Sequence, residues 1–256
     1  MIESHSFLDH VQAVLFDKDG TLLDFVGLWG PWLTALEARF QAYLVKAGAT
    51  KCRPFGHFGL GLTFDANGNP LRYNHLGPMS AGTMEQVETI LAWHLWNCGI
   101  AWHEALETVR KNIALVEQEF DDTRPVSPLP GLRPFIQELR ARGIPLGVVT
   151  SDNTSSAHRH LEWLRLADAF PVVMGRDSVS RGKPEPDMVH AACRQFGVDP
   201  RGVVLIGDSE IDMEMGRRAG VSLCVQIMPG AEVNVPHGKR WTVRHYTDLL
   251  DLCTCT

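Results

Sequence analysis

The sequence lacks a marked excess of charge of either sign. Lys and Arg together number 24, Asp and Glu number 30, and the formal net charge of -6 is not concentrated in any block. A basic patch is the usual electrostatic signature of a protein that binds nucleic acid or an anionic membrane. We therefore expect neither of these as a partner.

Long apolar runs are also missing, and the first residues do not predict a secretory leader. No stretch approaches the roughly 20 apolar residues that a membrane-spanning helix needs, and the first ten residues carry acids and histidines instead of a basic start and an apolar run. The six cysteines show no paired metal-type spacing, which favours free thiols in a reducing compartment. These absences predict a cytoplasmic protein, and we expect a monomer or a homodimer.

The chain does contain a regular alternation of strand and helix patterns in its second half. Nearly all-apolar strands that alternate with amphipathic helices are typical of a parallel sheet covered on both faces. The expected strands are 11–16, 145–150, 171–174, 202–207 and 221–227, and the expected helices between the later strands are 132–142, 155–166, 186–196 and 211–219. This pattern predicts an α/β fold with a three-layer, Rossmann-like core.

A mainly helical segment interrupts this core after its first strand. Apolar residues recur at helical spacing over much of 25–124, and a hairpin is expected around Asn67-Gly68. Trp93 and Trp96 lie at helical spacing, which favours buried packing. We therefore predict a core domain of residues 1–24 and 125–256 with an inserted helical domain of residues 25–124.

Polar side chains follow the apolar strands directly. Ligands of such folds bind beyond the carboxyl ends of the strands, so these residues are expected to converge. The candidates are Asp17 and Asp19 after the first strand, Thr150 and Ser151 after the second, Lys183 in a loop, and Asp208 and Asp212 after the strand 202–207. Alternate residues of an extended segment point the same way, so Asp17 and Asp19 are expected to share the site while Lys18 faces elsewhere.

The chemistry of these candidates favours a cation and a phosphoryl group. Close carboxylates repel one another unless a cation neutralises them, and the oxygen ligands of Asp17, Asp19 and Asp208 favour Mg²⁺ over zinc. A hydroxyl and an ammonium group, from Thr150 and Lys183, suit the remaining phosphoryl oxygens. One carboxylate can then attack phosphorus, and a second can serve as acid and base.

Four ordered motifs carry a resemblance to a known family. Asp17-Lys-Asp-Gly-Thr-Leu22, Val148-Val-Thr-Ser151, Gly182-Lys-Pro184 and Gly207-Asp-Ser-Glu-Ile-Asp212 are similar to the motifs of the haloacid dehalogenase superfamily. The nearest group is the phosphoglycolate phosphatase-like enzymes, whose helical cap is inserted after the first motif. The insert here is longer than the simple caps of that group, and Ser151-Asp152 departs from its usual Thr-Asn pair.

The resemblance implies a role for each motif residue. Asp17 would be the nucleophile and Asp19 the acid and base, while Thr150, with Ser151 beside it, and Lys183 would bind the phosphate. Mg²⁺ would be held by the Asp17 carboxylate, the Asp19 backbone carbonyl and Asp208, with Asp212 in support. The resulting prediction is an Mg²⁺-dependent phosphatase that hydrolyses a small organic phosphomonoester, such as a phosphoglycolate-like compound or a sugar phosphate, through an aspartyl-phosphate. The cap would select this small-molecule phosphate ester.

Three alternatives remain open. A phosphomutase of the same superfamily would use the same aspartates. A phosphonate-cleaving variant would need a Schiff-base lysine in the insert, for which Lys46 and Lys51 are the candidates. A phosphoacceptor switch module would hold its phosphoryl group without turnover. Such modules carry an acidic pair before the phosphorylated Asp and lack a large insert after it. Here the second acid, Asp19, follows Asp17, and a large insert is present.

Overall fold

The computed structural model describes residues 7–49, 59–229, 233–235 and 238–254. Lys51, Cys52 and Cys255, together with residues 53–58 of the insert, lie outside the described residues. The chain divides into two compact units, one of residues 1–24 and 127–256 and the other of residues 25–126. Each unit is described by itself.

The first unit is built on a six-stranded sheet in the order β5-β4-β1-β6-β7-β8. All of its strand pairs are parallel. The strands are β1 (Ala13–Phe16), β4 (Leu146–Val149), β5 (Val172–Met174), β6 (Val203–Gly207), β7 (Leu223–Ile227) and β8 (Arg240–Val243). The predicted α/β fold with a parallel sheet is confirmed, and β8 adds a strand that the apolar pattern did not predict.

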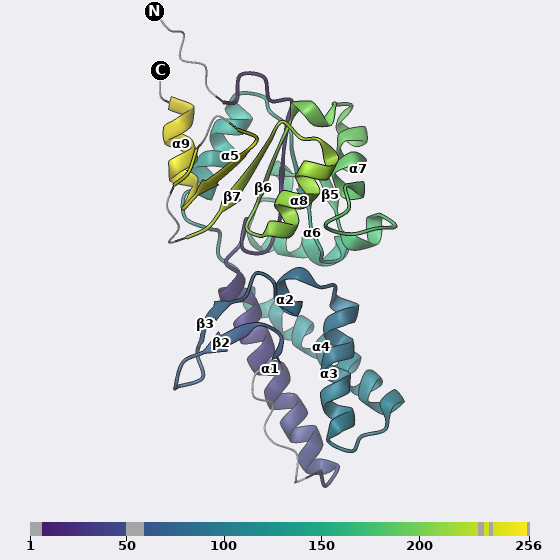
Figure 1. The fold of residues 1–256 in the computed structure, drawn as a ribbon. Helices are drawn as coiled ribbons and strands as arrows, with labels where there is room; N and C mark the ends of the chain where they lie inside the picture. Colours follow the sequence, from purple (N-terminus) through teal and green to yellow (C-terminus); the bar gives the residue numbers. More distant parts are fainter. Residues whose placement is uncertain (1–6, 50–58, 230–232, 236–237, 255–256) are drawn as a thin grey trace, which may run out of the picture. The chain divides into compact units, whose positions relative to one another are not determined.

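Helices cover both faces of this sheet (Figure 1). They are α5 (Leu132–Ala141), α6 (Thr154–Trp163), α7 (Asp187–Phe196), α8 (Glu210–Ala219) and α9 (Tyr246–Thr254). Side chains of α7 and α8 pack with Ala13 and Leu15 of β1 in one buried cluster. Phe16, on the opposite face, contacts the rings of Phe135 in α5 and Tyr246 in α9. Successive residues of β1 thus enter two cores, which explains why this strand is apolar throughout.

The second unit contains helices and one antiparallel hairpin. Its elements are α1 (Phe25–Lys46), β2 (Leu62–Phe64), β3 (Pro70–Tyr73), α2 (Pro78–Ala81), α3 (Met84–Asn97) and α4 (Trp102–Thr123). The hairpin turns at Gly68, whose positive φ of 81° is accessible to glycine at little cost. Phe25 of α1 stacks on Tyr73 of β3, with ring centroids 4.0 Å apart.

Two expectations for the second unit are wrong. Trp93 and Trp96 are each 51% exposed, because the buried face of α3 is formed by Val87, Leu91, Ala92 and Leu95. Cys98 is disulfide-bonded, although its position in the sequence gave no sign of a pairing. Cys193, Cys224 and Cys253 are free and buried, as expected.

No helix in the described part of the chain combines the length and the apolar character needed to cross a membrane.

Candidate active site

The three central strands of the sheet place the first, second and fourth motifs side by side. Phe16 of β1 is in register with Val148 of β4 and with Ile206 of β6, and the Asp17 N–H donates to the Ile206 carbonyl at 2.8 Å. The chain therefore leaves all three strands at the same edge of the sheet. The sequence located the polar residues at strand ends, and the strand order brings those ends together.

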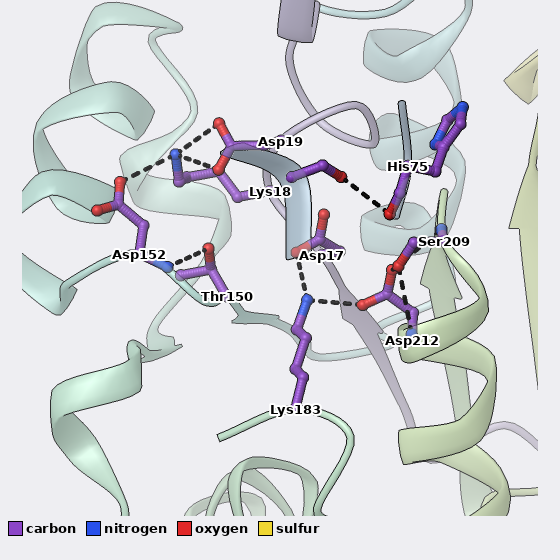
Figure 2. A network of polar contacts seen from close by, with 10 residues as sticks. Asp17, Lys18, Asp19, His75, Thr150, Asp152, Lys183, Ser209 and Asp212 are labelled. Atoms are coloured by element: carbon purple, nitrogen blue, oxygen red, sulfur yellow. Dashed lines mark hydrogen bonds and ion pairs between the residues drawn. The ribbon is translucent and has the colours of Figure 1, made fainter. Parts of the chain in front are cut away.

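Lys183 connects two of the predicted acids. Its ammonium Nζ lies 2.5 Å from Asp17 Oδ1 and 2.6 Å from Asp212 Oδ1 (Figure 2). Only 5% of the Lys183 side chain, 8% of the Asp17 side chain and 1% of the Asp212 side chain is exposed. Because the three side chains are shielded from water, their charge-assisted contacts are strong. The lysine and the two aspartates neutralise one another's charge.

A capping box at the start of α8 orients Asp212. The second oxygen of this carboxylate, Oδ2, accepts hydrogen bonds from the Ser209 hydroxyl at 2.5 Å and from the Ser209 N–H at 3.2 Å. The Ser209 hydroxyl in turn accepts from the Asp212 N–H. Asp212 thus stabilises the N-terminus of the helix with one oxygen and directs the other at Lys183. One side chain therefore serves both the helix N-terminus and Lys183.

The charges in this group perturb one another. Burial raises the pKa of Asp17 well above its ordinary value; Lys183 opposes this effect, whereas Asp212 and Asp208 add to it. Burial alone would lower the pKa of Lys183, but the carboxylates of Asp17 and Asp212 outweigh it and raise that pKa. One lysine does not cancel the negative charge of three neighbouring aspartates.

These aspartates fit a hard divalent cation. Asp17, Asp208 and Asp212 each offer a carboxylate oxygen, and the three oxygens lie within 4.8 Å of one another. Oxygen donors of this kind suit Mg²⁺, and a cation there would offset the carboxylate repulsion that adds to the effect of burial on the Asp17 pKa. Asp212 belongs to this carboxylate group together with the predicted ligands Asp17 and Asp208. Asp19 was expected to contribute its backbone carbonyl.

The side chain of Asp19 does not follow the expected alternation. Its carboxylate is bound by Lys18, whose Nζ lies 2.9 Å from Oδ1 and 2.7 Å from Oδ2. The alternation argument holds for an extended strand, but β1 ends at Phe16, and the chain then turns through Gly20 at a φ of 76°. The expectation that Lys18 points away from the functional acids is therefore wrong.

The segment after β4 holds the remaining predicted residues. Thr150 is buried, and its hydroxyl accepts from the Asp152 N–H at 3.1 Å, while Ser151 is half-buried. Asp152 and His160, which were not predicted as site residues, both contact Lys18. His160 is a polar residue on the buried face of α6, and that position was the only sequence signal that could have drawn attention to it.

Two further residues support the site from the last third of the chain. Gln226 is buried in β7, and its side-chain amide donates to the Asp208 carbonyl at 3.1 Å. Tyr246 in α9 donates its hydroxyl to the Thr21 carbonyl at 3.2 Å. A glutamine within an otherwise apolar strand was a usable signal, whereas the sequence around Tyr246 offered none. Burial, together with the charges of Asp17 and Asp208, raises the pKa of Tyr246 well above its ordinary value.

The fold and this site define a class. Residues 11–220 match the family model of the haloacid dehalogenase-like hydrolases, which covers most of the chain, and the protein belongs to that family. The chain is 27% identical over 266 residues to N-acetylmuramic acid 6-phosphate phosphatase of Pseudomonas aeruginosa, covering 96% of this chain and 98% of the relative. It is also 27% identical over 224 residues to phosphoglycolate phosphatase of Neisseria meningitidis, covering 83% of this chain and 79% of the relative.

Solved structures agree on the fold. A haloacid dehalogenase-superfamily hydrolase of subfamily IA from Geobacter sulfurreducens superposes with a TM-score of 0.63 at 23% identity, covering 97% of this chain and 100% of the other. The family and the names of the curated relatives support the predicted enzyme class, a phosphoric monoester hydrolase.

Proposed function

We propose that this protein is an Mg²⁺-dependent phosphatase that hydrolyses a small organic phosphomonoester through an aspartyl-phosphate on Asp17. The observation that carries the proposal is the Lys183 ammonium held between Asp17 and Asp212 beside Asp208, at the carboxyl ends of β1 and β6. This arrangement offers a nucleophilic carboxylate, a fixed positive charge and a set of oxygen ligands in one place.

The residues divide the reaction into two displacements. A carboxylate oxygen of Asp17 attacks phosphorus, the bond from phosphorus to the ester oxygen breaks, and Asp19 gives its proton to the departing oxygen. Water then attacks the same phosphorus, its proton passes to Asp19, and the bond to Asp17 breaks to release inorganic phosphate. Asp19 thereby returns to its protonated form, so protons balance over the cycle.

The other residues bind charge. Thr150, with Ser151, and Lys183 are assigned to the phosphoryl oxygens, where hydrogen-bond donors and a cation stabilise developing negative charge. Asp17, Asp208 and the Asp19 carbonyl, with support from Asp212, would hold Mg²⁺. When bound, this ion supplies positive charge that offsets repulsion between the carboxylates and the substrate.

The substrate class is inferred from the relatives. The relatives from Pseudomonas aeruginosa and Neisseria meningitidis are named N-acetylmuramic acid 6-phosphate phosphatase and phosphoglycolate phosphatase. A sugar phosphate and a small acid phosphate have a phosphomonoester in common, and we carry over only that shared chemistry. Substrate choice is assigned to the insert of residues 25–124, where the sequence resemblance places the selecting domain.

A phosphate-release screen tests the proposal. The purified chain is incubated with a panel of sugar phosphates and small acid phosphates, in Mg²⁺ and in excess chelator. We expect release that requires Mg²⁺ and falls about a thousandfold or more in Asp17→Asn, because that variant lacks the nucleophile. Asp168→Asn, which changes an exposed acid outside the site, is the matched control and should retain activity.

Three results would count against the proposal. Full activity in Asp17→Asn would remove the assigned nucleophile. Conversion of a sugar phosphate to its isomer without release of inorganic phosphate would identify a phosphomutase instead. A stable phosphoprotein that releases no phosphate would favour the switch module.

A further inference from the structure

Lys18 is an unusual residue to find fully buried. Its side chain is 0% exposed, although lysine is among the residues least often buried, and removal of an ammonium group from water costs several kcal/mol. Replacing a buried ion pair with apolar side chains is often neutral or even stabilising, so stability alone does not account for this lysine.

The ammonium group of Lys18 meets three acceptors. Its Nζ contacts the Asp19 carboxylate at 2.7 Å, Asp152 Oδ2 at 3.2 Å and His160 Nδ1 at 3.0 Å (Figure 2 shows the two carboxylates). The contact with Asp152 is an ion pair, whereas Asp19 and His160 lie in hydrogen-bond positions, and an ammonium group can only donate to them. The His160 ring therefore accepts at Nδ1, which requires the neutral imidazole with its proton on Nε2.

The two acceptors besides Asp19 are themselves held in place. Asp152 accepts from the Asn153 N–H at 2.7 Å, and its backbone carbonyl accepts from the Arg176 N–H at 2.8 Å. His160 lies on the buried face of α6 with its ring 5.1 Å from that of Trp163. Burial, with Lys18 and Arg159 adding to it, lowers the pKa of His160 well below its ordinary value, which agrees with the neutral ring.

We propose that Lys18 is a positioning residue that fixes the carboxyl group of Asp19 for proton transfer, with Asp152 and His160 as its anchors. The inference rests on the proposed function, in which Asp19 protonates the leaving oxygen. Proton transfer requires a carboxyl group within hydrogen-bond reach of the reacting oxygen. Asp19 lies beyond the end of β1, just before the turn at Gly20, and Lys18 connects its carboxylate to the loop after β4 and to α6.

A double-mutant cycle tests whether Lys18 acts through Asp19. Lys18→Met is prepared in the wild-type chain and in Asp19→Asn, and kcat/KM is measured with the best substrate of the phosphate panel. In the wild-type chain we expect a loss of about 30-fold, which is part of the roughly hundredfold or greater rate enhancement that general acid–base catalysis supplies. In Asp19→Asn the same change should cost no more than about twofold, because residues that act as a unit are not additive.

The leaving group provides a readout that general damage would not change. The substrates are phenyl phosphates whose phenols range from the acidic p-nitrophenol to the weakly acidic p-methoxyphenol. An acidic phenol leaves without protonation, so a misplaced Asp19 should affect mainly the weakly acidic ones. Lys18→Met should therefore steepen the dependence of log kcat/KM on the leaving-group pKa.

A pair of His160 variants preserves the test if Lys18→Met does not fold. His160→Leu retains both ion pairs of Lys18 but removes one acceptor, whereas His160→Gln offers a replacement oxygen. We expect His160→Leu to lower kcat/KM about fivefold for the p-methoxyphenyl ester and at most about twofold for the p-nitrophenyl ester, with His160→Gln recovering most of the loss.

Failure of the inference and failure of the proposed function give different results. If the wild-type chain releases phosphate but the Lys18 and Asp19 losses multiply, or every phenyl ester slows equally, Lys18 has no positioning role. If the wild-type chain releases no phosphate from any substrate, the proposed function itself is wrong.

Discussion

At the scale of single residues, the site depends on side chains that use each polar atom for a separate purpose. Asp212 caps α8 with Oδ2 and contacts Lys183 with Oδ1. Its position requires close approach to the end of β6. A Cβ at Gly207 would lie 2.5 Å from the Cβ of Asp212 and 2.6 Å from its Cγ. Glycine at this strand end is therefore a steric requirement of the site.

Gly207→Ala should displace Asp212 and weaken the site. We expect a loss of about 1–3 kcal/mol in the free energy of unfolding, typical of overpacking, and a fall in kcat/KM of at least about tenfold as the contact with Lys183 is disturbed. Thermal unfolding and phosphate release measure the two effects. Gly238→Ala, whose added Cβ meets nothing within 4 Å, is the matched control. Equal behaviour of both variants would contradict this steric argument.

At the scale of elements, the sequence predicted what local pattern determines. Buried strands such as β6 were found to within a residue or two because each is an unbroken apolar run between helices. In contrast, β8 was missed because Arg240-Trp-Thr-Val243 lies at the edge of the sheet and is only partly buried. The short helix α9, which follows it, was missed as well.

In the candidate site, too, local sequence patterns predicted some features and missed others. The positions of Asp17, Thr150, Lys183 and Asp208 followed from strand ends and motifs. The contacts of Lys18 with Asp152 and His160 could not be predicted, because they join the segment after β1 to the loop after β4 and to α6. Those segments meet only through the strand order, in which β4 is adjacent to β1. Sequence spacing carries no information on such long-range contacts.

Tyr246 tests the contribution of α9, the element that the sequence did not reveal. Its hydroxyl joins this helix to the Thr21 carbonyl in the turn after β1, and the side chain is fully buried. Tyr246→Phe should lower the free energy of unfolding by about 1–2 kcal/mol, because a buried acceptor loses its donor. Tyr43→Phe removes a hydroxyl that donates to Glu104 at an exposed position and should cost less than about 0.5 kcal/mol. Urea unfolding compares them, and equal costs would show that α9 does not hold the turn through this bond.

At the scale of the whole molecule, the inserted domain does not interrupt the sheet of the core unit. The Asp24 N–H donates to the Ser127 carbonyl at 2.9 Å, and Leu23 forms an antiparallel bridge with Pro128. The chain thus departs and returns at neighbouring points, and β1 keeps its central place between β4 and β6. The stability of the core should therefore respond to what binds at the ends of these three strands.

Mg²⁺ should stabilise the folded chain through the aspartates at those strand ends. A ligand that binds only the folded state at one hundred times its Kd adds about 2.7 kcal/mol, which corresponds to a rise in Tm on the order of 5 °C for a chain of this size. Asp208→Asn should abolish most of this rise because it removes one of the three grouped carboxylates. Without Mg²⁺ the variant should be at least as stable as the wild type, since Asp208 repels the neighbouring Asp17.

Calorimetric scans in MgCl₂, and in NaCl of equal ionic strength, separate binding from general screening, and Asp168→Asn should behave as the wild type does. A wild-type chain whose Tm ignores Mg²⁺, or an Asp208→Asn variant with the full response, would contradict the assignment of a cation to this group. Asp208→Asn should leave stability unchanged or raise it without Mg²⁺, and should lower stability relative to the wild type when Mg²⁺ is present. This change of sign distinguishes a cation site from a carboxylate that only supports the fold. A structural carboxylate would destabilise the chain on removal under both conditions.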